Sequence, residues 1–162
     1  MTQQSGTRRQ NVEQERGRQA WDNVQVIKTQ SERLKDNKLQ KEYRSFALGL
    51  NAMIQINGLG QTLGFLKAKG KDKDKQGKQA INAHSFLLGH LTHWMHDHFS
   101  TDVTDYILDQ PASKNDGLLD WVTRTASSAD YRRATTECLA FGNWLRRFAE
   151  AELKEPEAGE EQ

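Results

Sequence analysis

The sequence predicts an all-α fold, a compact single-domain bundle of about six or seven helices. Apolar residues recur at steps of three and four along most of the chain, as they do on one face of a helix. Runs that alternate between apolar and polar residues, as half-buried strands do, are scarce. Two prolines and a 35% share of hydrophobic residues among 162 residues favour one domain with a modest core over a linker.

The first helix is predicted over about residues 7–35, with a candidate break near Ser31. It follows a disordered start at residues 1–7 and opens the helical domain, which we place at residues 8–152. Its apolar stripe consists of Val12, Gln19 or Ala20, Val24 and Ile27, with Trp21 beside it.

The clearest pattern predicts a hairpin of two helices at about residues 37–56 and 59–68. Asn and Gly tolerate the left-handed backbone that ends a helix, so Asn57, Gly58 and Gly60 predict a tight bend between them. The stripe comprises Leu39, Tyr43, Phe46, Ala47, Leu50, Met53 and Ile54 before the bend and Leu59, Leu63 and Leu66 after it. These glycines follow a helix, and their spacing fits neither the dinucleotide fingerprint nor the phosphate-binding loop, so we reject both motifs.

The second half of the chain predicts helices at about residues 79–98, 101–109 and 128–153. The helices at 101–109 and 128–153 are separated by a turn at residues 110–115 and by a short helix. Leu118, Leu119 and Val122 mark that short helix. The core-facing residues of the helix at 79–98 are Ile81, His84, Leu87, Leu88, Leu91 and Met95. The last helix has a wide apolar face, which needs several helix neighbours or a second protein: Tyr131, Ala134, Thr135, Cys138, Leu139, Phe141, Gly142, Trp144, Leu145, Phe148 and Ala149.

Charge divides the chain into a basic body and an acidic tail. Residues 150–162 contain six glutamates and one lysine and carry −5, which leaves +6 on residues 1–149 because the net charge is +1. The tail at residues 153–162 is predicted to be disordered. Basic patches on the helices and in a lysine loop at residues 69–78 can neutralise phosphates without reading bases. The candidate contacts to an RNA backbone are Arg8, Arg9, Arg16, Arg18, Lys38, Lys41, Arg44, Lys67, Lys69, Lys71, Lys73, Lys75, Lys78, Arg132, Arg133, Arg146 and Arg147.

A cluster of histidines offers the alternative interpretation, a small helical metal-dependent phosphohydrolase. The cluster comprises His90, His93, His96 and His98. Such an enzyme would use His93, His96 and Asp97, and the His96-Asp97 pair is similar to the dipeptide of these enzymes. They need a further histidine and an aspartate from other helices, and nothing in the sequence fixes the geometry of Asp102, Asp105 or Asp109. We favour a polar helix face, and we expect no catalytic residue, no metal and no cofactor.

The sequence favours a cytoplasmic location and no membrane association. No apolar segment follows the two arginines near the start, so no secretory signal is predicted, and no apolar run is long enough to span a membrane. Cys138 is the only cysteine and cannot form an internal disulfide.

Two blocks of the sequence resemble the small-subunit family of the type III-B CRISPR effector, the Cmr complex. The first block begins with an aromatic residue and a serine and continues with an apolar stripe, an Asn-Gly-Leu bend and a Thr-Leu-x-Phe-x-x-x-Lys run. Its residues are Tyr43, Ser45, Leu50, Met53, Ile54, Asn57, Gly58, Leu59, Thr62, Leu63, Phe65 and Lys69. The second, on the last helix, comprises Tyr131, Arg132, Glu137, Leu139, Trp144, Leu145, Arg147, Phe148 and Ala149. The resemblance covers about residues 8–152.

The resemblance implies an all-α, non-catalytic subunit, because RNA cleavage in such complexes belongs to another subunit. Several copies stack along the effector in antiviral defence. The implied partners are the other Cmr subunits, neighbouring copies of the same chain, and the guide and target RNA. The motifs do not fix the RNA contacts, so the basic residues above stay candidates. The small subunit of a related type III complex stays an alternative, although the bend at Asn57, Gly58 and Leu59 favours the Cmr family.

Overall fold

The computed structural model describes residues 3–71, 82–98 and 117–157. Within these ranges the chain forms six helices and no strand, which confirms the all-α prediction. The helices are α1 (Gln3–Arg33), α2 (Lys38–Asn57), α3 (Leu59–Gly70), α4 (Ala83–His98), α6 (Gly117–Arg124) and α7 (Ser128–Glu152). The predicted helix at 101–109 and turn at 110–115 lie outside the described residues, as do Lys73, Lys75 and Lys78.

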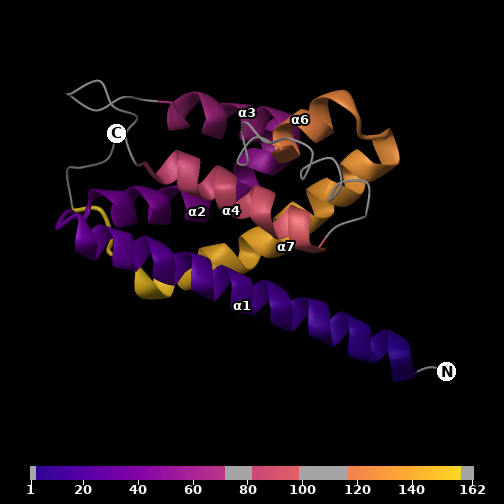
Figure 1. Cartoon of the computed structure of the whole chain (residues 1–162), viewed down its shortest axis with the longest axis horizontal. Coiled ribbons are helices and arrows are strands. Elements are labelled where there is room, and N and C mark those ends of the chain that lie inside the picture. Colours follow the sequence, from indigo (N-terminus) through magenta and orange to yellow (C-terminus); the bar gives the residue numbers. More distant parts are fainter. Residues whose placement is uncertain (1–2, 72–81, 99–116, 158–162) are drawn as a thin grey trace.

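The long helix α7 is the centre of the packing. It contacts α1 along one side and α2 and α4 along the other, while α3 contacts α2, α4 and α6. Figure 1 shows α1 along one edge of the bundle, with its N-terminal turns reaching beyond the other helices.

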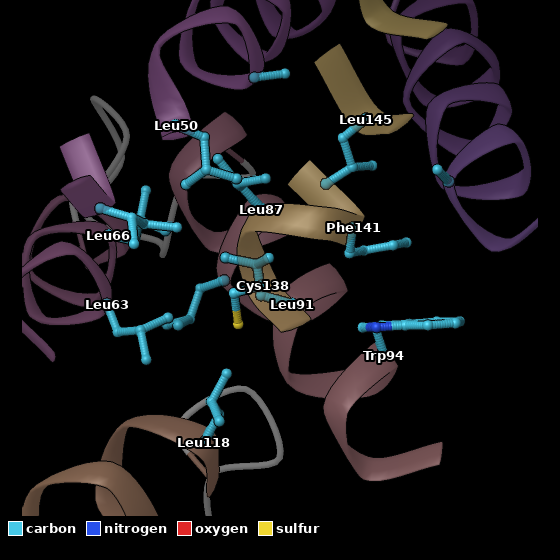
Figure 2. Close-up of a cluster of buried hydrophobic side chains, with 14 of the residues drawn as sticks. Leu50, Leu63, Leu66, Leu87, Leu91, Trp94, Leu118, Cys138, Phe141 and Leu145 are labelled. Carbon is cyan, nitrogen blue, oxygen red and sulfur yellow. The ribbon is translucent and has the colours of Figure 1, made fainter. Parts of the chain in front are cut away.

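All six helices contribute to the core, and its part between α2, α3, α4, α6 and α7 has leucines around a few larger side chains (Figure 2). Trp94 and Phe141 stack with their ring centroids 4.9 Å apart, and Cys138 is fully buried among the leucines. The buried stripe of α7 consists of Ala134, Cys138, Phe141, Gly142, Leu145 and Ala149. Tyr131, Leu139, Trp144 and Phe148, predicted on the same face, are only partly buried at its margins.

Several predicted helix ends differ from those of the structure. α1 begins at Gln3 instead of near Thr7, and it continues through Ser31 without the break predicted there. It ends because Lys35 adopts a left-handed backbone with φ of 52°. α4 begins at Ala83 instead of near Gln79, because the side chain of Asn82 caps it by accepting a hydrogen bond from the Ser85 amide at 3.0 Å.

The predicted bend after α2 is present and is fixed from two sides. The amide of Gly58 donates to the carbonyl of Ile54 at 2.8 Å, and the Thr62 hydroxyl donates to the carbonyl of Gly58 at 2.9 Å. The amide of Gly60 donates to the hydroxyl of Tyr131 on α7 at 2.8 Å. This last bond joins the bend to the last helix.

Gly58 is the position in the bend that requires glycine. Its φ of 87° and ψ of 160° lie in a region that side-chain-bearing residues rarely enter. Gly58→Ala is therefore expected to lower the free energy of unfolding by about 1–3 kcal/mol, measured by urea denaturation.

Gly64, also within the hairpin, provides the matched control. It lies inside α3, where an added Cβ would meet no atom within 4 Å. Because alanine is the better helix former, Gly64→Ala should leave stability unchanged or raise it by up to about 1 kcal/mol. Equal effects of the two substitutions would contradict the role assigned to Gly58.

Candidate nucleic-acid interface

Several apolar residues of the two sequence motifs are buried, build the fold and are not available to a ligand. Leu50, Ile54, Leu59, Leu63 and Leu145 are essentially inaccessible to solvent. Phe65 is an apolar exception, because it is 37% exposed beside the ring of His84. The apolar residues of the motifs therefore specify how helices cross, and a nucleic-acid surface has to come from polar side chains, among them the exposed motif residues Lys69, Arg132 and Arg147.

Glu137, from the second motif, links three helices. Both its oxygens accept hydrogen bonds from Arg16 of α1, each at 2.8 Å, and the indole of Trp94 on α4 also donates to it at 3.0 Å. The third nitrogen of the Arg16 guanidinium donates to Glu13 at 2.7 Å. Arg16 was predicted as a phosphate contact, but these bonds occupy all its nitrogens, so we assign it a structural role.

The ionisation of this cluster follows from its contacts. Burial raises the pKa of Glu137, but the hydrogen bonds from Arg16 and Trp94 outweigh burial and hold the pKa below its ordinary value. The hydrogen bond to Glu137 raises the pKa of Arg16. Both groups are therefore charged at neutral pH, and the pair acts as an ionic link between α1 and α7.

Lys38, Lys41 and Arg44, the three candidate RNA-backbone contacts on α2, differ in how far their side chains are exposed. The side chain of Lys38 is 74% exposed, with Glu42 at 3.9 Å. Lys41 and Arg44 are only 16% and 11% exposed, and each pairs with a glutamate of the acidic tail. Glu157 lies 3.7 Å from Lys41, and Glu155 lies 3.1 Å from Arg44. The start of the tail, predicted to be disordered, thus has a defined path along α2.

The exposed cations lie mainly on α1, the end of α3 and α7. Lys69 and Lys71 are exposed at the C-terminal end of α3, and Lys67 is half-buried in its last turn. Arg133 is exposed and pairs with Asp130 at 3.1 Å. The other exposed candidates are Arg18, Arg132, Arg146 and Arg147. Arg8 and Arg9 lie in α1, but their side chains are outside the described part of the chain. Such separate patches can hold phosphates at several points along a backbone.

An open groove between α1 and α7, which the sequence did not predict, carries exposed aromatic rings. It has a volume of about 880 Å³ and is lined by Glu13, Gln14, Gly17, Arg18, Trp21, Trp144 and Phe148. Trp21 is 40% exposed and meets Phe148 edge to face, with the ring centroids 5.3 Å apart. Gly17 leaves room for Trp144, whose ring would lie 3.4 Å from a Cβ at that position. The groove is therefore a surface of apolar rings with charged residues beside them.

The histidines of α4 point in different directions. His90 is partly buried and hydrogen-bonded to the Tyr43 hydroxyl at 2.7 Å. Burial, with a smaller effect of His93, lowers the pKa of His90 to about 3, so the ring is neutral. His98 stacks on Trp94 and lies 3.3 Å from Glu15. The cluster seen in the sequence is thus divided between the core and the surface.

The residues proposed for a phosphohydrolase form a local surface group. Asp97 lies 3.1 Å from the Nε2 of His93 and 2.8 Å from the Nδ1 of His96. In the part of the chain that the structure describes, no three His, Cys, Asp or Glu side chains are placed to hold a metal ion. The alternative therefore gains no support from these residues.

The fold and the site define a class of protein: a small all-α protein whose buried apolar motif residues fix the helix packing and whose exposed cations lie on several surfaces. None of the described helices is both long and apolar enough to cross a membrane. Residues 12–152 match the model of the family described as CRISPR-associated protein (Cas_Cmr5). The chain belongs to this family, the small-subunit family of the type III-B CRISPR Cmr complex, as the two motifs predicted.

Proposed function

We propose that this Cmr-associated protein is a non-catalytic structural subunit that contacts RNA backbone and neighbouring subunits. It acts in the cytoplasm, in copies stacked along the RNA-silencing complex in antiviral defence. The observation that supports this most is that buried apolar residues of the family motifs hold the helices together, while most of the described candidate cations remain at the surface. Support for a non-catalytic role comes from the divergent directions of the α4 histidines.

The RNA contact is electrostatic and does not depend on sequence. Lys69 and Lys71 lie at the end of α3, and Arg146 and Arg147 are exposed on α7. Each phosphate that such a cation neutralises releases counterions, so RNA affinity should fall as the salt concentration rises. The guide and target RNA of the complex are the ligands that this surface fits.

We assign the contact with a neighbouring copy to the groove between α1 and α7. Its exposed Trp21 and partly buried Phe148 are the kind of side chain that is enriched at the centre of protein interfaces. Glu13 and Arg18 give it charges of both signs, which suits a second copy of the same chain better than a polyanion.

The test is affinity purification of the tagged protein from its native cell, with sequencing of the bound RNA and identification of the chains that co-purify. We expect repeat-derived guide RNAs, a stable set of partner subunits and more than one copy of this chain by native mass spectrometry. A lone protein without RNA that carries a metal lost on His93→Ala would contradict the proposal and favour the phosphohydrolase.

The same purification tests the groove through Trp21→Ser. We expect fewer copies of this chain per complex, because the substitution removes an exposed ring at the contact. Ile56→Ser is the control, since Ile56 is 80% exposed on α2 and does not line the groove. An unchanged copy number in Trp21→Ser would remove the groove from the interface.

A further inference from the structure

The first residues of the acidic tail are held against α2 by apolar and polar contacts. After α7 ends at Glu152, the side chain of Leu153 is buried, and the amide of Lys154 donates to the Gln40 side chain at 3.1 Å. Glu152 itself lies 3.5 Å from Lys28 of α1. These contacts set the direction in which residues 155–157 leave the bundle.

Along this path, two carboxylates of the tail lie beside two cations of α2, and the cations are one helical turn apart. Glu155 Oε1 lies 3.1 Å from Arg44 Nη2, and Glu157 Oε1 lies 3.7 Å from Lys41 Nζ. The glutamate side chains are 77% and 80% exposed, whereas the cations beneath them are largely covered. Ion pairs with so exposed a partner contribute little to stability, so the glutamates can leave at small cost.

The hydrogen bonding of Arg44 is incomplete. Its Nε is buried and makes no hydrogen bond with the described residues, because a single oxygen of Glu155 meets only Nη2. A guanidinium binds a phosphate through two parallel hydrogen bonds. A phosphate oxygen pair would therefore use both Nη2 and Nε, while Lys41 supplied a second positive charge one turn away.

We propose that Lys41 and Arg44 form a phosphodiester-binding site on α2, and that residues 155–157 occupy it and compete with RNA for it. The inference rests on the proposed function, since it assumes that the protein contacts RNA backbone. The family match ends at residue 152, so the competing segment lies outside the matched residues. The tail thus makes RNA binding at α2 weaker than the cations alone would allow.

The experiment compares full-length proteins for binding of a fluorescent oligouridine by anisotropy at low salt. Glu155→Gln with Glu157→Gln should lower the dissociation constant about three- to tenfold, because it removes two exposed ion pairs that compete with RNA. The control is Asp22→Asn with Glu150→Gln, which removes two exposed carboxylates from α1 and α7 and changes the net charge equally. In a Lys41→Gln, Arg44→Gln background, neutralising the tail should give no further gain.

The outcomes separate this inference from the proposed function. If the tail variant tightens binding no more than the control while binding remains salt-dependent, the tail is not a competitor and only the inference fails. If the tail variant binds more tightly with and without Lys41 and Arg44, the site is not on α2. If no variant binds RNA at any salt concentration, the RNA contact itself and this inference both fail.

Discussion

Glu137→Ala is expected to lower the free energy of unfolding by about 3 kcal/mol, measured by urea denaturation followed through tryptophan fluorescence. The substitution leaves the Arg16 guanidinium in a site where its side chain is only 15% exposed, without the partner that accepts two of its hydrogen bonds. It also removes the acceptor of the buried Trp94 indole. A charge left without its partner in such a site costs more than the loss of the attraction alone.

Glu13→Ala is the matched control, because Glu13 also pairs with Arg16 but its side chain is 56% exposed. Its expected cost is below about 1 kcal/mol. If Glu137→Ala and Glu13→Ala lower the free energy of unfolding equally, the ionic link between α1 and α7 contributes no more to stability than a surface ion pair does.

The same cluster gives a dependence of stability on pH. The pKa of Glu137 is lower in the fold than its ordinary value of 4.5, so the folded protein holds the proton less tightly than the unfolded chain does. The stabilisation is therefore fully present above pH 4.5 and is lost as the pH falls through the folded pKa. The stability difference between wild type and Glu137→Gln should be constant near neutral pH and should shrink in acid.

The sequence predicted those helices whose apolar spacing and end residues lie within the helix itself. The spacing of Leu50 and Ile54 predicted the face of α2, and the bend at Gly58 was predicted from the backbone freedom of glycine. The motifs also predicted the family, whose model matches residues 12–152.

The sequence could not distinguish a surface cation from a structural one. Arg16 was grouped with Arg18 because both are basic residues of the first helix, yet Arg16 binds Glu137, 121 residues away, and Arg18 is exposed. That difference depends on how α1 crosses α7, which no local pattern records.

The acidic tail shows the same limit. Its composition predicted disorder along its whole length, but Leu153 continues the spacing of Ala149 and is buried. This spacing was visible in the sequence, whereas the pairing of Glu155 with Arg44 follows only from the direction of the chain after α7.

Lys69→Glu with Lys71→Glu is expected to weaken RNA capture by the assembled complex by about tenfold or more at low salt. Both lysines are exposed at the end of α3, and each phosphate contact on a single strand contributes about −0.7 to the slope of log affinity against log salt. Loss of two contacts should therefore make the slope less negative by about 1.4 units. The measurement is anisotropy of a labelled target RNA on the purified complex at increasing salt concentrations.

Arg33→Glu with Arg124→Glu is the matched control, because it reverses two exposed cations at the ends of α1 and α6 and changes the net charge equally. Glutamate at the C-terminal end of α3 also opposes the helix dipole at a cost of about 0.3–1 kcal/mol, so a thermal melt has to confirm that the variant is folded. Lys69→Gln with Lys71→Gln avoids most of that cost and should give a smaller effect in the same direction. A slope that changes equally in the control variant would indicate a general charge effect, and an unchanged slope in both would remove the end of α3 from the RNA interface.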